Sequence, residues 1–123
     1  MHKNLTITSV LGVLTIVLGA FGAHALKEIL TIDQINSFET AVRYQMYHVI
    51  VLLFVNTYAG FTNRKRKQIS WLFFAGILLF SGSIYAIQLT SITAKSIWFV
   101  PPLGGLLFVS GWILMAVSFL KKK

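Results

Sequence analysis

Four long apolar runs occupy most of the 123-residue chain and restrict its fold more than any other feature. They cover residues 5–26, 39–61, 69–90 and 97–120, and each has roughly the 20 residues that an α-helix needs to cross about 30 Å of hydrocarbon. A membrane β-barrel requires alternating polar and apolar residues, whereas VLGVLTIVLGAFGA is apolar on every face. The sequence therefore predicts an all-α membrane protein whose residues 1–123 form a single membrane domain with four transmembrane helices.

The basic residues indicate how these helices are oriented. Most of the 11 lie before the first run, between the second and third, and after the fourth: Lys3, Arg64, Lys65, Arg66, Lys67, Lys121, Lys122 and Lys123. With four crossings these places share one side of the membrane, and the opposite loops contain only Lys27 and Lys95. Because cytoplasmic loops are enriched in Lys and Arg, we expect both termini in the cytoplasm and a multi-pass protein of the inner (plasma) membrane. The short connections predict an antiparallel bundle.

Composition excludes several classes of protein. The net charge of +8 is typical of nucleic-acid binding, but its residues lie where membrane topology accounts for them, so we expect no nucleic-acid partner. Contact of the NRKRK segment with lipid headgroups is expected instead. The absence of cysteine excludes disulfides, thiolate metal sites and thiol catalysis.

The amino-terminal run has a second interpretation. His2 and Lys3, the apolar stretch after them, and Ala23-His24-Ala25 resemble a signal peptide with an A-x-A cleavage site. However, the stretch is longer than the roughly 7 to 15 residues of such peptides. Cleavage would also leave three crossings with the basic loops on opposite sides. We therefore expect a retained helix.

Small residues recur at helical spacing in three of the runs. They are Thr8, Gly12, Thr15, Gly19 and Gly22 in the first run, Ala75, Gly82 and Ala86 in the third, and Gly104, Gly111 and Ser118 in the fourth. Lipid provides little hydrophobic drive for helix association, so close packing along such seams holds membrane bundles together. We expect these seams to be helix contacts.

Polar residues gather in the half of the bundle that this topology places near the outer face. They are His24, Glu39, Arg43, Tyr44, Tyr47, His48, Ser81, Ser83 and Tyr85. On a helical wheel the members from the second run occupy one half of the cylinder. Ionisable groups at membrane depth usually face the bundle interior or a watery cavity. The pattern predicts a polar ligand pocket open to the outer face.

Individual members of this group also have structural interpretations. Glu39 and Arg43 are an i, i+4 pair in the favourable order, and we expect a structural ion pair that ties the second run to a neighbouring helix, with a catalytic or substrate-binding pair as the alternative. His24 and His48 are weak candidates for metal or haem ligation, since imidazole suits Zn, Cu and Fe. Without a further carboxylate or thiol we expect hydrogen-bonded structural histidines and no cofactor, with proton transfer as another alternative.

Four segments carry a family resemblance. GAFGAHALK at 19–27, TAVRYQMYH at 40–48, FSGSIY at 80–85 and PLGGLLFVSGW at 102–112 together resemble the small four-span membrane proteins catalogued as Domain of Unknown Function 423. The resemblance extends over essentially the whole chain in matching order. It implies a four-helix inner-membrane protein of bacteria, and it implies no activity.

Three roles remain open from the sequence. The first is a structural or regulatory protein that packs through its small-residue seams against itself, as a homo-oligomer, or against a membrane-protein partner. The second is binding or transport of a small polar or amphipathic ligand in the outward-facing pocket, although the apolar inner half offers no continuous polar path for transport. The third is a His-ligated metal or haem module. We do not expect an enzyme, because the sequence offers neither an activated nucleophile nor a second well-placed carboxylate.

Overall fold

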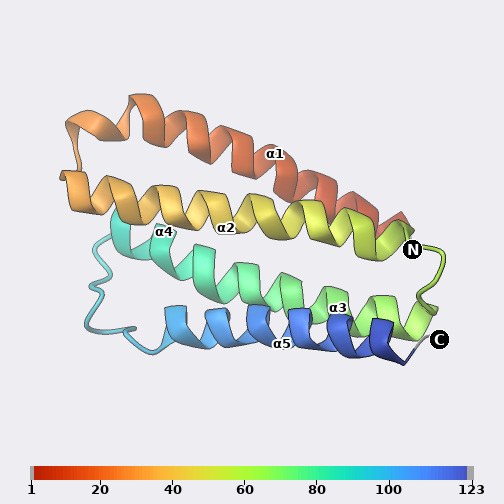
Figure 1. Ribbon diagram of the computed structural model, residues 1–123. Coiled ribbons are helices and arrows are strands. Elements are labelled where there is room, and N and C mark those ends of the chain that lie inside the picture. The colour runs from red at the N-terminus through yellow and green to blue at the C-terminus, as the bar shows by residue number, and fades with distance from the viewer. Residues whose placement is uncertain (1, 122–123) are drawn as a thin grey trace.

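The computed structural model describes residues 2–121, and this range contains helices and no strand. The elements are α1 (His2–His24), the 3₁₀ turn η1 (Leu26–Glu28), α2 (Ile32–Thr57), α3 (Asn63–Gly76), the π-helical turn η2 (Ile77–Ser81), α4 (Gly82–Leu89) and α5 (Val100–Leu120). Figure 1 shows long rods side by side, with successive rods running in opposite directions and with α3, η2 and α4 forming one continuous rod. The predicted all-α class is confirmed.

Three helical stretches are long and apolar enough to cross a membrane: His2–His24, Asn63–Leu89 and Val100–Leu120. The 26-residue α2 is not among them. Polar residues such as Arg43, Gln45 and His48 lower its hydropathy in the middle of its length. The four predicted runs therefore separate into three plainly apolar rods and one mixed helix.

The connection between α1 and α2 differs from the predicted one. Helix α2 begins at Ile32, well before the predicted start at residue 39, because Thr31 forms a capping box. The Thr31 hydroxyl accepts the Gln34 N–H at 3.2 Å, and the Gln34 side chain accepts the Thr31 N–H at 2.9 Å. The segment at 27–37, between the first two predicted runs, therefore contributes to η1 and to the start of α2.

The small-residue seam of α1 is a contact with α2, as predicted. Thr8, Thr15 and Gly22 are buried. A Cβ on Gly22 would lie 2.7 Å from the Phe38 ring, so the two helices approach closely there. The first rod therefore packs mainly on α2.

The seam of α5 is likewise a contact, in this case with α3 and η2. Gly104, Gly111 and Ser118 are buried, and a Cβ on Gly111 would lie 2.5 Å from the Phe73 ring. This confirms the predicted seam of the fourth run.

The predicted seam of the third run is displaced. Ala75, Gly82 and Ala86 are only partly buried, and the close contact is at Gly76, where a Cβ would lie 2.5 Å from the Phe108 ring. The wider π-helical turn of η2 changes which later residues face α5. Regular α-helical spacing therefore does not predict the contacts beyond residue 76.

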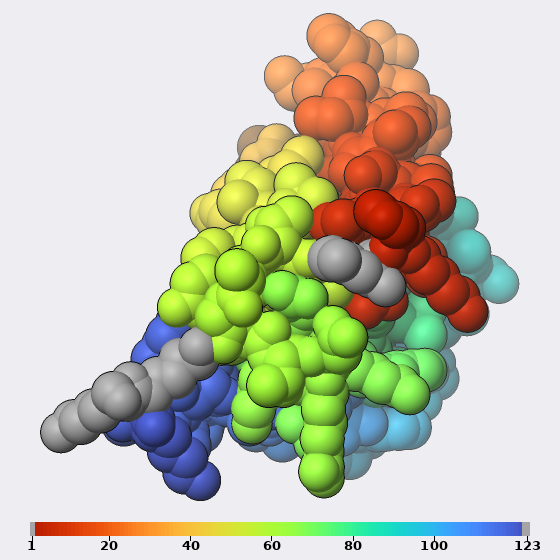
Figure 2. All heavy atoms as spheres, turned by 90° about the vertical axis from the view of Figure 1, so that its right-hand side faces the viewer, coloured from red at the N-terminus to blue at the C-terminus, as the bar shows by residue number. Residues whose placement is uncertain are grey.

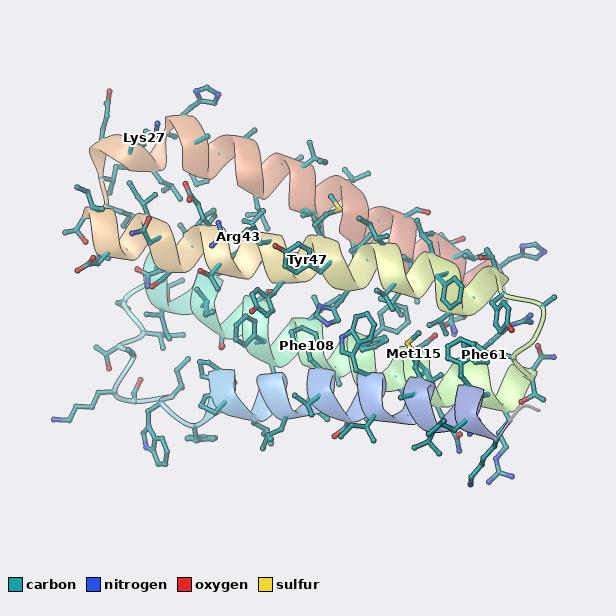
Figure 3. The ribbon with its side chains drawn as sticks, viewed as in Figure 1. Lys27, Arg43, Tyr47, Phe61, Phe108 and Met115 are labelled. Atoms are coloured by element: carbon teal, nitrogen blue, oxygen red, sulfur yellow. The ribbon has the colours of Figure 1, made fainter. Side chains whose placement is uncertain are left out.

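The apolar core lies between α2, α3 and α5, toward the end of the molecule that holds both described termini (Figure 1). Its buried members are Leu52, Val55, Phe61, Ile69, Phe73, Ile77, Phe108 and Met115. Phe61, Phe108 and Met115 are labelled in Figure 3. Because α1 contributes no buried member to this cluster, the first helix lies on the outside of α2.

Candidate functional site

His48 joins α2 to α5 through one ring nitrogen and bonds within α2 through the other. Its Nε2 lies 3.1 Å from Trp112 Nε1, and its Nδ1 lies 2.6 Å from the Tyr44 carbonyl oxygen. An indole N–H only donates, so Nε2 accepts, and Nδ1 therefore carries the proton that it donates to the carbonyl. The ring also stacks on Phe108 with centroids 3.7 Å apart. His48 is thus a buried neutral imidazole whose two nitrogens both have hydrogen-bond partners.

Gln45 connects three rods. The Tyr85 hydroxyl donates to Gln45 Oε1 at 2.6 Å, and Gln45 Nε2 donates to the Leu11 carbonyl at 3.1 Å. Helices α4, α2 and α1 are therefore linked at one level by a short polar chain. Sequence analysis identified Tyr85 but did not single out Gln45; its place one helical turn after Ala41, about 120° around α2 from Glu39, was the available signal.

The π-helical turn brings a third polar contact to α2. Ser81 Oγ donates to the Ala41 carbonyl at 2.7 Å, and both residues are buried. Ser83 Oγ donates to the Phe80 carbonyl at 2.9 Å within its own rod. The two serines therefore serve helix packing, one between rods and one within a rod.

Four predicted pocket residues lie on the outside of α2. Glu39, Arg43, Tyr44 and Tyr47 are exposed, and Figure 3 shows Arg43 and Tyr47 on α2. Arg43 Nη1 and Glu39 Oε2 lie 3.9 Å apart on the surface of α2, so the pair lies within this helix. The expectation that this arc faces the bundle interior is wrong for Glu39, Arg43 and Tyr47, whereas the exposed Tyr44 also packs its ring on Phe80, with centroids 5.2 Å apart.

Helical geometry explains the difference. On a wheel of about 100° per residue that starts at Glu39, Arg43 and Tyr47 lie near about 40° and about 80°. The buried positions of α2 lie between about 160° and about 280° on that wheel; they are Phe38, Ala41, Gln45, His48, Val49, Leu52, Val55 and Asn56. The polar half of the cylinder therefore extends across the boundary between the buried and the exposed face, with His48 on the buried side.

The structure does not bring the two candidate metal ligands together. His24 is exposed at the end of α1, near the level where Gly22 meets Phe38. His48 lies ten residues farther along α2, which is about 15 Å. Among residues 2–121 there is no group of three or more His, Cys, Asp or Glu side chains able to hold a metal ion.

A second polar group, which sequence analysis did not single out, lies at the opposite end of α2. Buried Asn56 donates from Nδ2 to the Leu52 carbonyl and to Ser70 Oγ, both at 2.9 Å. Its Oδ1 accepts from Asn4 Nδ2 at 3.2 Å. Asn56 therefore ties α2 to both α1 and α3 at this end.

A cavity of about 880 Å³ opens beside this group, between the start of α1 and α3. Figure 2 views the molecule from this end, with the first turns of α1 in red next to the α2–α3 region in green. The cavity is lined by Lys3, Asn4, Ile7, Leu11, Asn56, Asn63, Arg66, Lys67, Ser70, Trp71, Phe74 and Ile77. Its wall is thus apolar along α1 and along α3 and η2, and polar or basic toward the chain termini.

Charge is unequally distributed over the two ends. The lining includes Lys3, Arg66 and Lys67 and no acidic residue. The acidic residues Glu28, Asp33 and Glu39 all belong to η1 or the first half of α2, at the other end (Figure 1). Two sequence signals could have indicated this site. They are the basic NRKRK segment and the asparagines near the ends of two apolar runs, Asn4 and Asn56.

Comparison with known proteins identifies the family. The sequence profile described as "Protein of unknown function (DUF423)" matches residues 18–105. The chain belongs to this family. The predicted resemblance is therefore confirmed.

Curated relatives agree with this assignment. A UPF0382 membrane protein of Staphylococcus aureus is 41% identical over 103 residues, which cover 84% of this chain and 83% of the relative. A UPF0382 membrane protein of Haemophilus influenzae is 39% identical over 124 residues, covering 99% and 97%. No solved structure matches. The chain is accordingly an integral membrane protein.

The DUF423 match contains part of each site. It includes all of α2, η2 and α4, and with them Gln45, His48 and Tyr85, but it ends before Trp112. The α1 wall of the cavity precedes its first matched residue. The alignment with the Haemophilus influenzae relative extends over nearly the whole chain.

Proposed function

We propose that this DUF423 protein crosses the inner membrane four times, with both termini in the cytoplasm, and binds an anionic amphiphile such as a phospholipid between α1 and α3. The observation that carries the proposal is the cavity of about 880 Å³, which combines an apolar wall with a basic, acid-free rim. An amphiphile is the class of ligand that requires both surfaces at once.

The crossing of α2 is supported by where its polar groups lie. A helix with intramembrane polar residues is tolerated when these residues face the bundle and find partners there. Gln45, His48 and Asn56 are buried and bond to neighbouring rods. The low hydropathy of α2 is therefore compatible with a fourth crossing.

The orientation is supported by the separation of charge. Lys3, the basic segment 64–67 and Lys121 lie at the end of the rods where both described termini lie (Figure 1). Because basic residues concentrate on the cytoplasmic side, this end is assigned to the cytoplasm. The cavity then opens at the level of the inner-leaflet headgroups.

The apolar part of the cavity suits an acyl chain. Ile7 and Leu11 form the α1 wall, and Phe74 and Ile77 form the opposite wall. Since α1 packs mainly on α2, and α3 packs mainly on α5, the space between α1 and α3 faces the bilayer. Trp71, which is 65% exposed, lies at the edge, as is typical of tryptophan at a membrane interface. A lipid can therefore enter sideways from the inner leaflet.

The basic part suits a phosphate-bearing headgroup. Lys3 and Lys67 are exposed at the rim. Arg66 is held nearby, since its Nη2 donates to the Tyr58 carbonyl at 2.8 Å and its Nη1 to Asn63 Oδ1 at 3.1 Å. A basic side chain near an anionic membrane surface contributes about 1 kcal/mol of attraction. Anionic lipids should therefore bind more tightly than zwitterionic ones.

Native mass spectrometry of the purified protein with phosphatidylglycerol or phosphatidylcholine tests this proposal. We expect adducts with phosphatidylglycerol at several-fold lower lipid concentration than with phosphatidylcholine. The double variant Lys3→Gln/Lys67→Gln should lose most of this preference. The matched control Arg64→Gln/Lys121→Gln removes the same charge from the same end without altering the cavity lining, and should keep it. Equal binding of both lipids by the wild-type protein would refute the proposed ligand class.

A further inference from the structure

The exposed face of α2 changes character along its length. In the outer half it presents Asn36, Glu39, Arg43 and Tyr47, all of them exposed. In the inner half the same face continues with Ile50 and Phe54, which are 59% and 43% exposed. The polar part lies on a helix that, as proposed above, crosses the membrane.

The depth of Arg43 makes this face unusual. Asn56 lies level with Asn4 near the cytoplasmic end, and Arg43 is thirteen residues away along α2, which is about 20 Å. That places the base of its side chain inside a hydrocarbon layer of about 30 Å. Charged side chains at such depth almost always face protein or water, because contact with lipid tails is costly. The Glu39 and Arg43 side chains are 49% and 53% exposed, so we expect a protein surface to cover them in the membrane.

We infer that this face of α2 packs against the same face of a second copy of the chain, and that Glu39 of each protomer pairs with Arg43 of the other. A two-fold axis along the membrane normal keeps equivalent residues at equal depth. Glu39 and Arg43 are separated by one helical turn, about 6 Å, which an arginine side chain spans. The face is thus self-complementary in charge.

The intramolecular contacts leave these groups free to take such partners. The distance of 3.9 Å between Arg43 Nη1 and Glu39 Oε2 is too long for a hydrogen bond. The Arg43 guanidinium donates a hydrogen bond from Nη2 to Thr40 Oγ1 at 3.2 Å. A fork of five N–H donors can therefore engage a second carboxylate bidentately.

Aromatic side chains extend the same face. The Tyr44 and Tyr47 rings have centroids 5.6 Å apart and are 40% and 51% exposed. Such rings contribute large contact areas and hydroxyl groups to an interface. The cavity between α1 and α3 lies on other faces of the molecule, so lipid binding and self-association can succeed or fail independently.

Cysteine crosslinking in native membranes tests the contact, because the chain contains no cysteine of its own. We expect oxidation to convert Tyr47→Cys into a covalent dimer of twice the chain mass. The control Val109→Cys, on the exposed face of α5 and 52% exposed, should remain a monomer. Dimer formation by both variants, or by neither, would overturn the inference.

Charge reversal tests whether the partner at this face of α2 is a second copy of the chain. In the Tyr47→Cys background, Glu39→Arg or Arg43→Glu alone gives each protomer two like charges, and we expect crosslinking to fall at least several-fold. Co-expression of the two differently tagged variants should restore a mixed dimer, since one face is then doubly basic and the other doubly acidic. Neither variant retains an intramolecular pair, so restoration reports only the contact between chains. Unchanged crosslinking of the single variants, or a product containing a different protein, would refute pairing with a second copy.

Discussion

The Trp112 indole N–H donates a 3.1 Å hydrogen bond to His48 Nε2, and this bond links α5 to α2. The acceptor is 4% exposed and uses its other nitrogen on the Tyr44 carbonyl. The pair therefore specifies both the tautomer of the histidine and the register of the two helices.

Trp112→Phe should destabilise the protein, because it leaves the buried Nε2 of His48 without its donor. Loss of such a bond costs about 1–3 kcal/mol in proteins generally, and polar contacts between membrane helices average about 0.6 kcal/mol. We expect a decrease of about 1 kcal/mol in the free energy of unfolding, measured in mixed detergent micelles. Trp98→Phe, at a 70% exposed position, is the control and should have little effect.

The Tyr85–Gln45 bond should appear as a coupling energy in a double-mutant cycle. Tyr85→Phe and Gln45→Leu each break the 2.6 Å hydrogen bond, but the second change also removes the donor to the Leu11 carbonyl. We expect the double variant to be less destabilised than the sum of the two single variants, by about 0.5–2 kcal/mol. Strict additivity would mean that the two side chains do not interact in the membrane.

Gly104→Ala should separate α5 from the π-helical turn. A Cβ at Gly104 would lie 2.8 Å from both Leu79 C and Phe80 Cα, which are backbone atoms that cannot rotate away. Overpacking of this kind costs about 1–3 kcal/mol. The adjacent Gly105→Ala meets nothing within 4 Å and should be neutral or stabilising by up to about 1 kcal/mol, because alanine favours helix. Thermal unfolding of the two variants distinguishes a close approach from a general intolerance of substitution.

Ile7→Trp should reduce lipid binding by filling the cavity from its α1 wall. The residue is 40% exposed, so the larger side chain can be accommodated without disturbing the core. Val17→Trp, on α1 but outside the cavity lining and 56% exposed, is the matched control. We expect at least a several-fold weaker phosphatidylglycerol adduct for the first variant only, read by native mass spectrometry. Equal loss in both would point to a general effect of tryptophan on α1.

The proposed topology predicts which loops are reachable from outside the cell. Ser96→Cys lies in the exposed connection before α5, and Ala59→Cys lies in the exposed connection between α2 and α3. In intact cells whose outer barrier admits small molecules, a membrane-impermeant maleimide should label the first and not the second. After the inner membrane is permeabilised, both should react. The reverse pattern would place the termini outside the cytoplasm.

The spacing of residues predicts neighbours within one helix but not the direction in which other helices lie. This is why Gly104, Gly111 and Ser118 were recognisable as one seam, and why Glu39, Arg43 and His48 were recognisable as members of one polar half of α2. The same wheel contains no information on where that half is bounded by α1, α4 and α5. The assignment of Arg43 to the interior failed for this reason.

By itself, the sequence determined the helical class, the positions of the apolar runs, the basic end of the molecule and the family. These properties depend on local composition, because a run of about 20 apolar residues must form its backbone hydrogen bonds within itself in lipid. Only the tertiary structure decided that His48 meets Trp112, that Gln45 joins three rods, and that a cavity remains between α1 and α3. These depend on how far each helix is rotated and displaced against the next, which is set by packing across the whole bundle.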